Sequence, residues 1–423
     1  MVRAVMAEET PLSSPAIGTA TSDLISPCKE ERAHADPPAP PRQPPFALAF
    51  SGGGFRATLG AVGVLRFMAD AGLLSQVRWV SSVSGGSVAH GLLAHAHPEL
   101  ERAGFTPDAL DDLVVRPLVA RVSTTSLVKT LLRNAWRIVG RPTRTELLAD
   151  QFDDWFFHGR RLRELSRNCR FIFNASNLTT GVRFGLERDL IGDWVMGRID
   201  TPPELRLADA VAASAAFPGG FAPVVLDGLR FPCADGRVAK LLDGGAYDNM
   251  GLEPLDRLNE LAEPDLRDAC LVALNAGGVF RTGAYGRIPL VRDLMRANSL
   301  LYRQSTALRM RAMVERFQAW ERTPPGGERP RGARRGVLFG LATTLDQGLA
   351  QGWRAQNPEQ SDGDRRRLAL TKTSFDEFDF ALCRDLMYRG WWLAGATLSQ
   401  YHRDLLPPEL PGWREPARPT QSP

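Results

Sequence analysis

A serine in a turn of small residues is the first group in this sequence that could do chemistry. Ser84 is the third residue of the run SVSGG at residues 82–86, and the apolar run at 77–81 predicts a buried strand before it. A helix is expected to begin near Ser84. A serine on a sharp turn between a strand and a helix points out above the edge of the sheet, where it can act as a nucleophile. Such a turn needs small residues two positions before and two after the serine, and Ser82 and Gly86 meet that need, although glycine is more usual than serine at the first position.

Ser87 competes with Ser84 for the role of nucleophile. Gly85 and Ala89 flank Ser87 at the same spacing. Because Ser87 would lie one turn into the helix, the steric argument favours Ser84. A serine-rich turn without any chemistry is the remaining alternative.

A serine hydroxyl also needs a base that accepts its proton, and Asp243 is the best candidate. It follows the apolar residues Leu241 and Leu242, and two glycines turn the chain away directly after it. A carboxylate is a weak base, so Asp243 would have to contact Ser84 in a partly desolvated site. An ordinary turn aspartate and a Ser–His pair are the alternatives. None of the histidines lies in a glycine-rich loop late in the chain; they are His34, His90, His95, His97, His158 and His402.

The glycine-rich segment SGGGFRA at residues 51–57 is expected to connect a strand to a helix. Gly52, Gly53 and Gly54 would leave their backbone N–H groups unshielded at the helix N-terminus, which suits the oxyanion of an acyl transfer. Arg56 would anchor the turn or add positive potential. A dinucleotide site would need an acidic residue at the end of the second strand, and a P-loop would need Lys-Ser or Lys-Thr after its last glycine; both are absent here. A tight turn without a ligand is the remaining alternative.

Alternating strands and helices must position these three motifs. Apolar runs predict strands at residues 46–50, 77–81, 170–175 and 268–275, and Gly72 is placed to end the first helix. Such runs between helices predict a three-layer α/β/α fold with a mainly parallel central sheet and a helical C-terminal part. We expect a disordered Pro-rich leader at 1–45, one catalytic domain at 46–405 with a mobile loop at 322–336, and a flexible tail at 406–423.

Composition limits the class of protein. Hydrophobic residues make up 43% of the 423, so a packed core is expected; the net charge is +4, and almost all of the positive charge is carried by arginine. The five cysteines form no CxxC pair, so neither a zinc site nor a disulfide framework is predicted, and a reducing, cytoplasmic compartment fits best. There is no apolar run of signal-peptide or membrane-span length, so any membrane contact is expected to be peripheral.

Together, the three motifs resemble the patatin-like phospholipase family. The resemblance covers roughly residues 45–280, and the segments 174–181, 213–218 and 248–251 support it. It implies a Ser–Asp dyad of Ser84 and Asp243, which works through an acyl-enzyme without metal or other cofactor. It also implies that N–H groups of Gly53, Gly54 and Gly85 hold the oxyanion. The expected activity is that of a phospholipase A or lysophospholipase-like carboxylic ester hydrolase. An acyltransferase with the same dyad and an inactive lipid-binding protein are the alternatives.

Two basic amphipathic segments are candidates for contact with an anionic membrane. They are residues 124–140, which we prefer as the lid or membrane contact because they follow the helix after Ser84, and residues 288–320. Ordinary helices that pack an apolar face on the core are the alternative in both places. A lipid or phospholipid substrate is expected, and no nucleic-acid partner.

Overall fold

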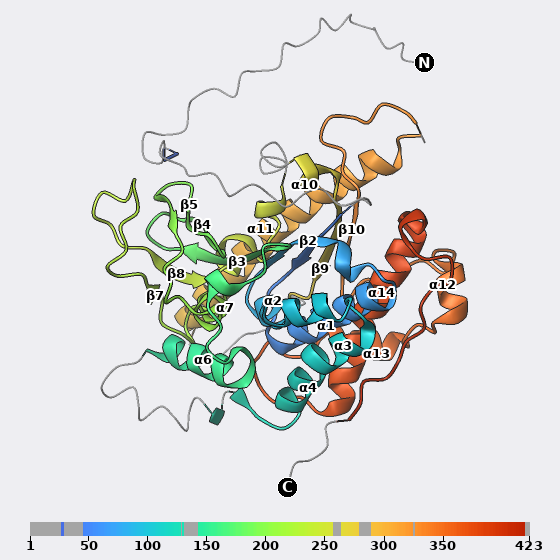
Figure 1. The fold of residues 1–423 in the computed structure, drawn as a ribbon, viewed down its shortest axis with the longest axis horizontal. Helices are drawn as coiled ribbons and strands as arrows, with labels where there is room; N and C mark the ends of the chain where they lie inside the picture. The colour runs from blue at the N-terminus through green and yellow to red at the C-terminus, as the bar shows by residue number, and fades with distance from the viewer. Residues whose placement is uncertain are drawn as a thin grey trace, which may run out of the picture.

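The computed structural model describes residues 27–28, 45–127, 129–130, 143–256, 264–278, 289–324 and 326–418. Within these ranges the centre of the molecule is a ten-stranded sheet in the order β10-β9-β1-β2-β3-β4-β5-β6, in which β8 pairs with β3 and β7 with β8 (Figure 1). The strands are β1 (Phe46–Phe50), β2 (Val77–Ser82), β3 (Arg170–Asn177), β4 (Val182–Leu186), β5 (Leu190–Asp193), β6 (Gly197–Asp200), β7 (Val224–Val225), β8 (Lys240–Asp243), β9 (Cys270–Asn275) and β10 (Gly336–Gly340).

The half of the sheet from β10 to β3 is parallel throughout. All four predicted strands are present in it, as β1, β2, β3 and β9. The last begins two residues later than expected, at Cys270, because a short helix ends at Asp268. The half from β3 to β6, together with β7 and β8, is antiparallel and was not predicted.

Helices cover both faces of the sheet. They are α1 (Gly54–Asp70), α2 (Gly85–Arg102), α3 (Pro107–Leu110), α4 (Arg116–Val122), α6 (Arg144–Phe152), α7 (Leu207–Ser214), α8 (Gly245–Asp248), α10 (Pro264–Asp268), α11 (Pro289–Glu321), α12 (Gln351–Gln356), α13 (Asp362–Ala369) and α14 (Phe380–Tyr401). Short 3-10 or π turns lie at Leu74–Gln76, Asp111–Val115, Asp153–Phe157, Leu162–Glu164, Glu253–Leu255 and Arg403–Leu405. None of the helices in the described ranges is both long enough and apolar enough to cross a membrane.

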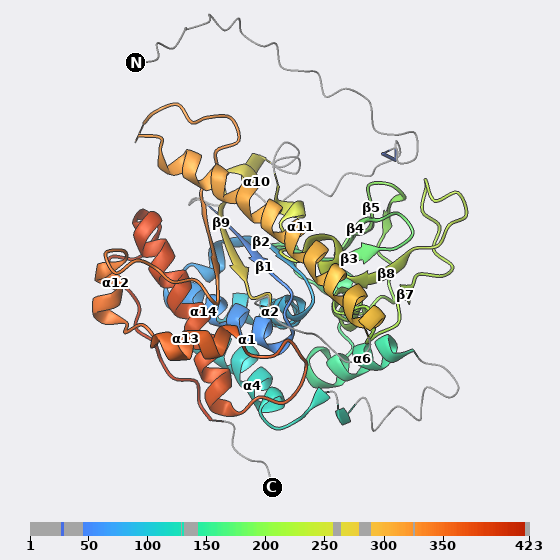
Figure 2. The ribbon, with the colours of Figure 1, turned by 180° about the vertical axis from the view of Figure 1, so that it is seen from behind.

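Alternate side chains along β1 point to opposite faces of the sheet. Phe46, Leu48 and Phe50 belong to a large core that includes α1, α2 and α14. Ala47 and Ala49 face a smaller core on the other side, to which α11 contributes (Figure 2). The three-layer α/β/α prediction is therefore confirmed, and so is the helical C-terminal part.

The first helix ends as predicted. Its C-cap is Ala71, and Gly72 follows with φ +69, a left-handed conformation that costs glycine little. The helix is buried on every side from Gly54 to Ala69, so it forms the centre of its layer.

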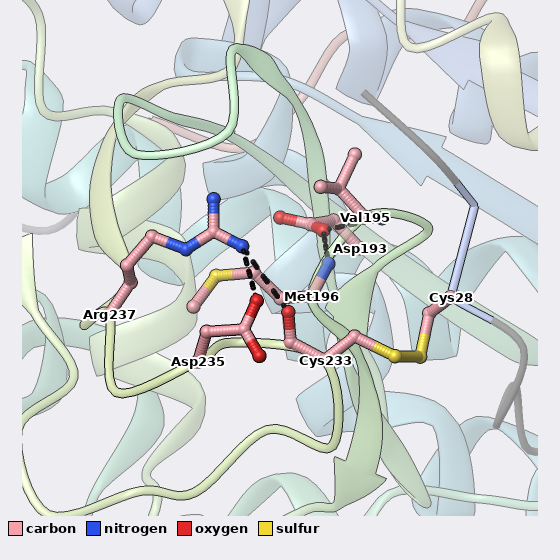
Figure 3. Close-up of a disulfide and its surroundings, with 7 residues drawn as sticks. All are labelled: Cys28, Asp193, Val195, Met196, Cys233, Asp235 and Arg237. Atoms are coloured by element: carbon pink, nitrogen blue, oxygen red, sulfur yellow. Dashed lines mark hydrogen bonds and ion pairs between the residues drawn. A yellow bond between two sulfur atoms is a disulfide. The ribbon is translucent and has the colours of Figure 1, made fainter. Parts of the chain in front are cut away.

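The sequence predicted no disulfide framework, and for one pair of cysteines this prediction is wrong. Cys28 and Cys233 form a disulfide, with Cα atoms 5.7 Å apart (Figure 3). The backbone N–H of Cys28 donates to Trp194 and that of Cys233 to Met196, so both cysteines are held against the turn between β5 and β6. Their positions differ by 205 residues, and only the folded chain brings them together. The premise for a reducing compartment is thereby removed, since disulfides persist mainly in oxidising compartments.

Candidate active site

Ser84 occupies a strained turn between β2 and α2. Its φ of 53° and ψ of −122° lie where side chains other than glycine are rare, which is typical of a nucleophile on a strand-to-helix elbow. A Cβ at Gly86 would lie 2.6 Å from the carbonyl oxygen of Phe50, so the turn excludes a larger residue there. The requirement for a small residue two positions after the serine is therefore seen directly.

Ser87 lies in a different environment. It belongs to α2, is fully buried, and its hydroxyl shares hydrogen bonds of 2.9 Å with the hydroxyls of Ser82 and Ser214. The serine at position 82, where glycine is more usual, thus has a partner of its own. The structure separates the two candidate serines, because only Ser84 contacts Asp243.

Asp243 ends β8, which pairs antiparallel with β3 and so brings the carboxylate beside the elbow. Its Oδ1 accepts the backbone N–H of Gly245 at 2.8 Å, and its side chain also forms a hydrogen bond with Ser84. Burial raises the pKa of Asp243 to about 6, although both hydrogen bonds favour the charged carboxylate and limit the rise. The side chains of Ser84 and Asp243 are thus in direct contact in a desolvated site.

The glycine turn lies against the elbow. A Cβ at Gly52 would stand 3.1 Å from Cβ of Ser84, and one at Gly85 would stand 2.1 Å from the carbonyl oxygen of Gly54. The N–H of Gly52 donates to the carbonyl of Asn249. In contrast, the N–H groups of Gly53, Gly54 and Gly85 have no hydrogen bond to another described residue. Three N–H donors are therefore available beside Ser84.

Arg56 anchors the glycine turn from within. Its guanidinium donates to the carbonyl of Ala276 at 2.8 and 3.1 Å, to Thr373 Oγ1 at 2.9 Å, and to the carbonyl of Thr371. The loop before α14 is tied to the same turn, because the carbonyl of Ser374 accepts the N–H of Phe55 at 3.0 Å. Arg56 was expected either to anchor the turn or to add positive potential, and these contacts support the first role.

No histidine in the described ranges is hydrogen-bonded to either member of the pair. His90 is the nearest along the chain; its Nδ1 shares a hydrogen bond of 2.6 Å with Ser82, and burial holds its pKa well below 6.5. His402 lies by Gly336, far along the chain. His34 lies outside the described residues. The contacts of the histidines therefore give no support to a Ser–His pair.

Ser214 is a part of the site whose role the sequence did not reveal. Its carbonyl accepts the N–H of Ser84 at 3.1 Å and the N–H of Gly244 at 3.3 Å, and its hydroxyl also accepts the N–H of Ser84 at 3.0 Å. One residue thus fixes the elbow and the turn after Asp243 to each other. The sequence points to the segment 213–218 only through the family resemblance. A serine in an alanine-rich helix does not form a sequence motif that would mark it as functional.

Asn249 and Tyr302 were also missed. The Tyr302 hydroxyl donates to Asn249 Oδ1 at 2.9 Å, next to the turn that follows Asp243. Asn249 falls in the segment 248–251, which the resemblance included. No sequence motif marks Tyr302 as a functional residue, since it is a single aromatic residue in a helix rich in leucine and arginine.

Comparison with solved structures supports the fold. A structure of human GIVD cytosolic phospholipase A2 aligns with a TM-score of 0.51 at 13% identity, covering 86% of this chain and 60% of that one. The same human protein in complex with methyl gamma-linolenyl fluorophosphonate aligns with a TM-score of 0.45 at 14% identity, covering 86% and 59%. The chain thus spans about three fifths of the length of these structures. At 13% identity, the first of these alignments describes the fold alone.

Comparison of sequences identifies one family domain in the chain. No curated protein matches the chain significantly. The profile described as patatin-like phospholipase matches residues 48–256, a stretch that contains the glycine turn, the elbow and Asp243. The chain therefore contains a patatin-like phospholipase domain at residues 48–256.

Proposed function

We propose that this protein is a lipid-acyl hydrolase that cleaves carboxylic esters with Ser84 as nucleophile and Asp243 as base. The observation that carries the proposal is the contact between the Ser84 hydroxyl, on its strained elbow, and the buried Asp243 carboxyl. The patatin-like phospholipase domain at residues 48–256 supports a phospholipase A or lysophospholipase-like reaction.

In the first half of the reaction, Ser84 Oγ attacks the ester carbonyl carbon while its proton passes to Asp243. The carbonyl oxygen becomes an oxyanion, and the free N–H groups of Gly53, Gly54 and Gly85 are placed to stabilise it. Collapse of this intermediate breaks the bond to the leaving alcohol, which takes the proton from Asp243. The products are an acyl-enzyme and the free alcohol.

In the second half, water attacks the acyl-enzyme. Asp243 accepts the water proton, a second oxyanion forms against the same N–H groups, and its collapse releases the fatty acid. The proton on Asp243 returns to Ser84 Oγ. Each cycle thus consumes one ester and one water and restores the dyad.

Burial makes a carboxylate suitable for this role. An aspartate with an ordinary pKa of 3.8 takes a proton from a hydroxyl too reluctantly at neutral pH, whereas a pKa of about 6 brings the base closer to the working pH. The hydrogen bond from Gly245 holds the carboxylate in position without the help of an imidazole.

Substitution of the dyad tests the assignment. We expect Ser84→Ala and Asp243→Asn each to lower hydrolysis of a p-nitrophenyl ester by at least roughly a thousandfold, because nucleophile and base act as one unit. Ser123→Ala and Asp235→Asn are matched controls: the Ser123 hydroxyl donates to the carbonyl of Val119 in α4, and Asp235 is exposed in a turn after β7. Unchanged turnover in either dyad variant would refute the proposal.

Covalent labelling distinguishes the two serines. A fluorophosphonate should modify the wild type and Ser87→Ala but not Ser84→Ala. The reverse pattern would assign the nucleophile to Ser87. A labelled acyl donor then shows whether water or an alcohol accepts the acyl group, and lipidomics with the Ser84→Ala variant identifies the lipid.

We also propose transient contact with an anionic membrane through α11 rather than through residues 124–140. Leu301 and Leu308, seven positions apart on α11, are 71% and 54% exposed. In the other segment Leu127 is fully buried and Ser126 is bonded to Asp376, while residues 131–140 lie outside the described ranges. The outward leucines of α11 are what favours this helix.

A further inference from the structure

Tyr302 reaches the candidate active site from α11, outside the stretch that matches the family. A Cβ at Gly245 would lie only 1.7 Å from the Tyr302 hydroxyl oxygen, so this oxygen lies directly against the turn that follows Asp243. No side chain larger than that of glycine fits at position 245 while the tyrosine is there. The hydroxyl donates its hydrogen to Asn249 Oδ1 at 2.9 Å.

Asn249 connects Tyr302 to the glycine turn. Its carbonyl oxygen accepts the N–H of Gly52 at 3.0 Å. Its side-chain Oδ1 would lie 2.5 Å from a Cβ at Gly52 and 2.9 Å from one at Gly245. The carboxamide of Asn249 therefore fills the space between the glycine turn and the turn of Asp243, and the Tyr302 hydroxyl fixes its orientation.

The hydroxyl of Tyr302 remains a donor over the whole working range of pH. Its pKa is raised well above 10, first by burial and then by the nearby negative charges of Asp243 and Asp248. A hydroxyl that holds its proton so firmly does not act as an acid or a base in the reaction. Its contribution is positional.

We propose that Tyr302 is a positioning residue for ester hydrolysis: it holds Asn249, and through Asn249 it directs the backbone N–H groups of Gly53 and Gly54 toward the developing oxyanion. The inference rests on the proposed function and adds a residue of the C-terminal part to its machinery. An oxyanion exists only in the transition state and the intermediates, so the loss of correct aim affects kcat more than KM.

A double-mutant cycle tests the proposal. In Tyr302→Phe we expect kcat to fall about tenfold, as for one lost hydrogen bond, while KM changes less than about twofold. Asn249→Ala should lower kcat at least as much, and the double variant should be no slower than Asn249→Ala, because Tyr302 acts through Asn249. The melting temperature of each variant is measured beside its kinetics. Tyr388→Phe, which loses a hydroxyl bonded to the carbonyl of Pro358, is the matched control and should equal the wild type.

Three results would overturn the proposal: an unchanged kcat in Tyr302→Phe, a rise in KM without a fall in kcat, or losses that multiply in the double variant. A fall in kcat that follows the melting temperature, and that Tyr388→Phe shares, would also overturn it, since it would report general destabilisation. Failure of the proposed function looks different. In that case the wild type itself neither hydrolyses esters nor reacts with a fluorophosphonate, and both proposals fall together.

Discussion

The carboxyl of Asp243 links the proposed chemistry to the stability of the fold. In the unfolded chain an aspartate has its ordinary pKa of 3.8, whereas burial raises the pKa of Asp243 in the folded protein to about 6. The folded protein therefore binds this proton more tightly than the unfolded chain. The contribution of the Asp243 carboxyl to the stability of the folded protein is fully present below pH 3.8 and is lost as the pH rises through about 6.

Two measurements follow from the protonation of Asp243. The kcat/KM of the wild type should rise with pH through a midpoint of about 6, because only the carboxylate accepts the serine proton.

Asp243→Asn, which removes the buried charge, should raise the free energy of unfolding at pH 8 by about 1–3 kcal/mol and leave it unchanged at pH 3. Urea denaturation at the two pH values measures this. A kinetic midpoint near 4, or an Asn variant that is less stable than the wild type at pH 8, would contradict the burial argument.

At the scale of single residues, the sequence was informative where a motif imposes a local geometry. Ser84 and Asp243 could be proposed as a pair because an elbow and an acid followed by two glycines each leave a short pattern. Ser214 and Tyr302 could not, since their hydrogen bonds to Ser84 and Asn249 join residues more than fifty positions apart along the chain. Long-range contacts of this kind have no periodicity or spacing that a sequence displays.

Among the elements, α11 has an unusual distribution of side chains. Its core-facing positions include Met313 and Phe317, while Leu301 and Leu308 point away from the core. Arg309, which the amphipathic pattern would place at the lipid surface, instead pairs with Glu253 at 3.1 Å. A helix that half-buries an arginine and exposes leucines presents an outer apolar surface for a partner.

We expect Leu301→Asp combined with Leu308→Asp to reduce binding to anionic phosphatidylglycerol vesicles by at least roughly tenfold. Each leucine that enters the lipid contributes about 1.5–3 kcal/mol, and the new carboxylates are repelled by the surface. Co-sedimentation with vesicles measures the effect. Leu370→Asp, another exposed leucine at the end of α13, is the control. Undiminished binding of the double variant would exclude α11 as the contact.

The strands illustrate what periodicity can and cannot predict. Residues 46–50 and 170–175 were recognisable because strands buried on both faces are continuous apolar runs. In β4 and β5, short strands with glycine and charged residues carry no such run, although they are buried. β8, which delivers Asp243, has only four residues, and its pairing with β3 depends on a contact about 65 residues away. The antiparallel half of the sheet was therefore beyond prediction.

On the scale of the whole molecule, segments outside residues 48–256 are integral to the fold. A Cβ at Gly63 of α1 would lie 2.0 Å from the carbonyl oxygen of Met387, and one at Gly390 would lie 2.0 Å from that of Gly60, so α14 packs directly on the first helix. In the expected mobile loop at 322–336, the fully buried side chain of Arg334 donates to the carbonyls of Leu255 and Leu266.

The expected tail at 406–423 also contacts the domain. The guanidinium of Arg66 lies 4.4 Å from the ring centroid of Trp413. The boundaries of the expected domain, loop and tail stay predictions.

The disulfide between Cys28 and Cys233 ties the expected leader to the antiparallel half of the sheet, and thiol counting tests it. Cys169, Cys270 and Cys383 are free and buried, so the denatured protein should react with three equivalents of maleimide before reduction and with five after it. A reductant should lower the free energy of unfolding of the wild type by about 2–4 kcal/mol, because the crosslink limits the freedom of the unfolded chain. The same reductant should leave Cys28→Ser unaffected. Alkylation inside intact cells, before the protein is purified, tests the compartment. Five reactive thiols would restore the premise for a reducing compartment, whereas three would place the folded protein where disulfides persist.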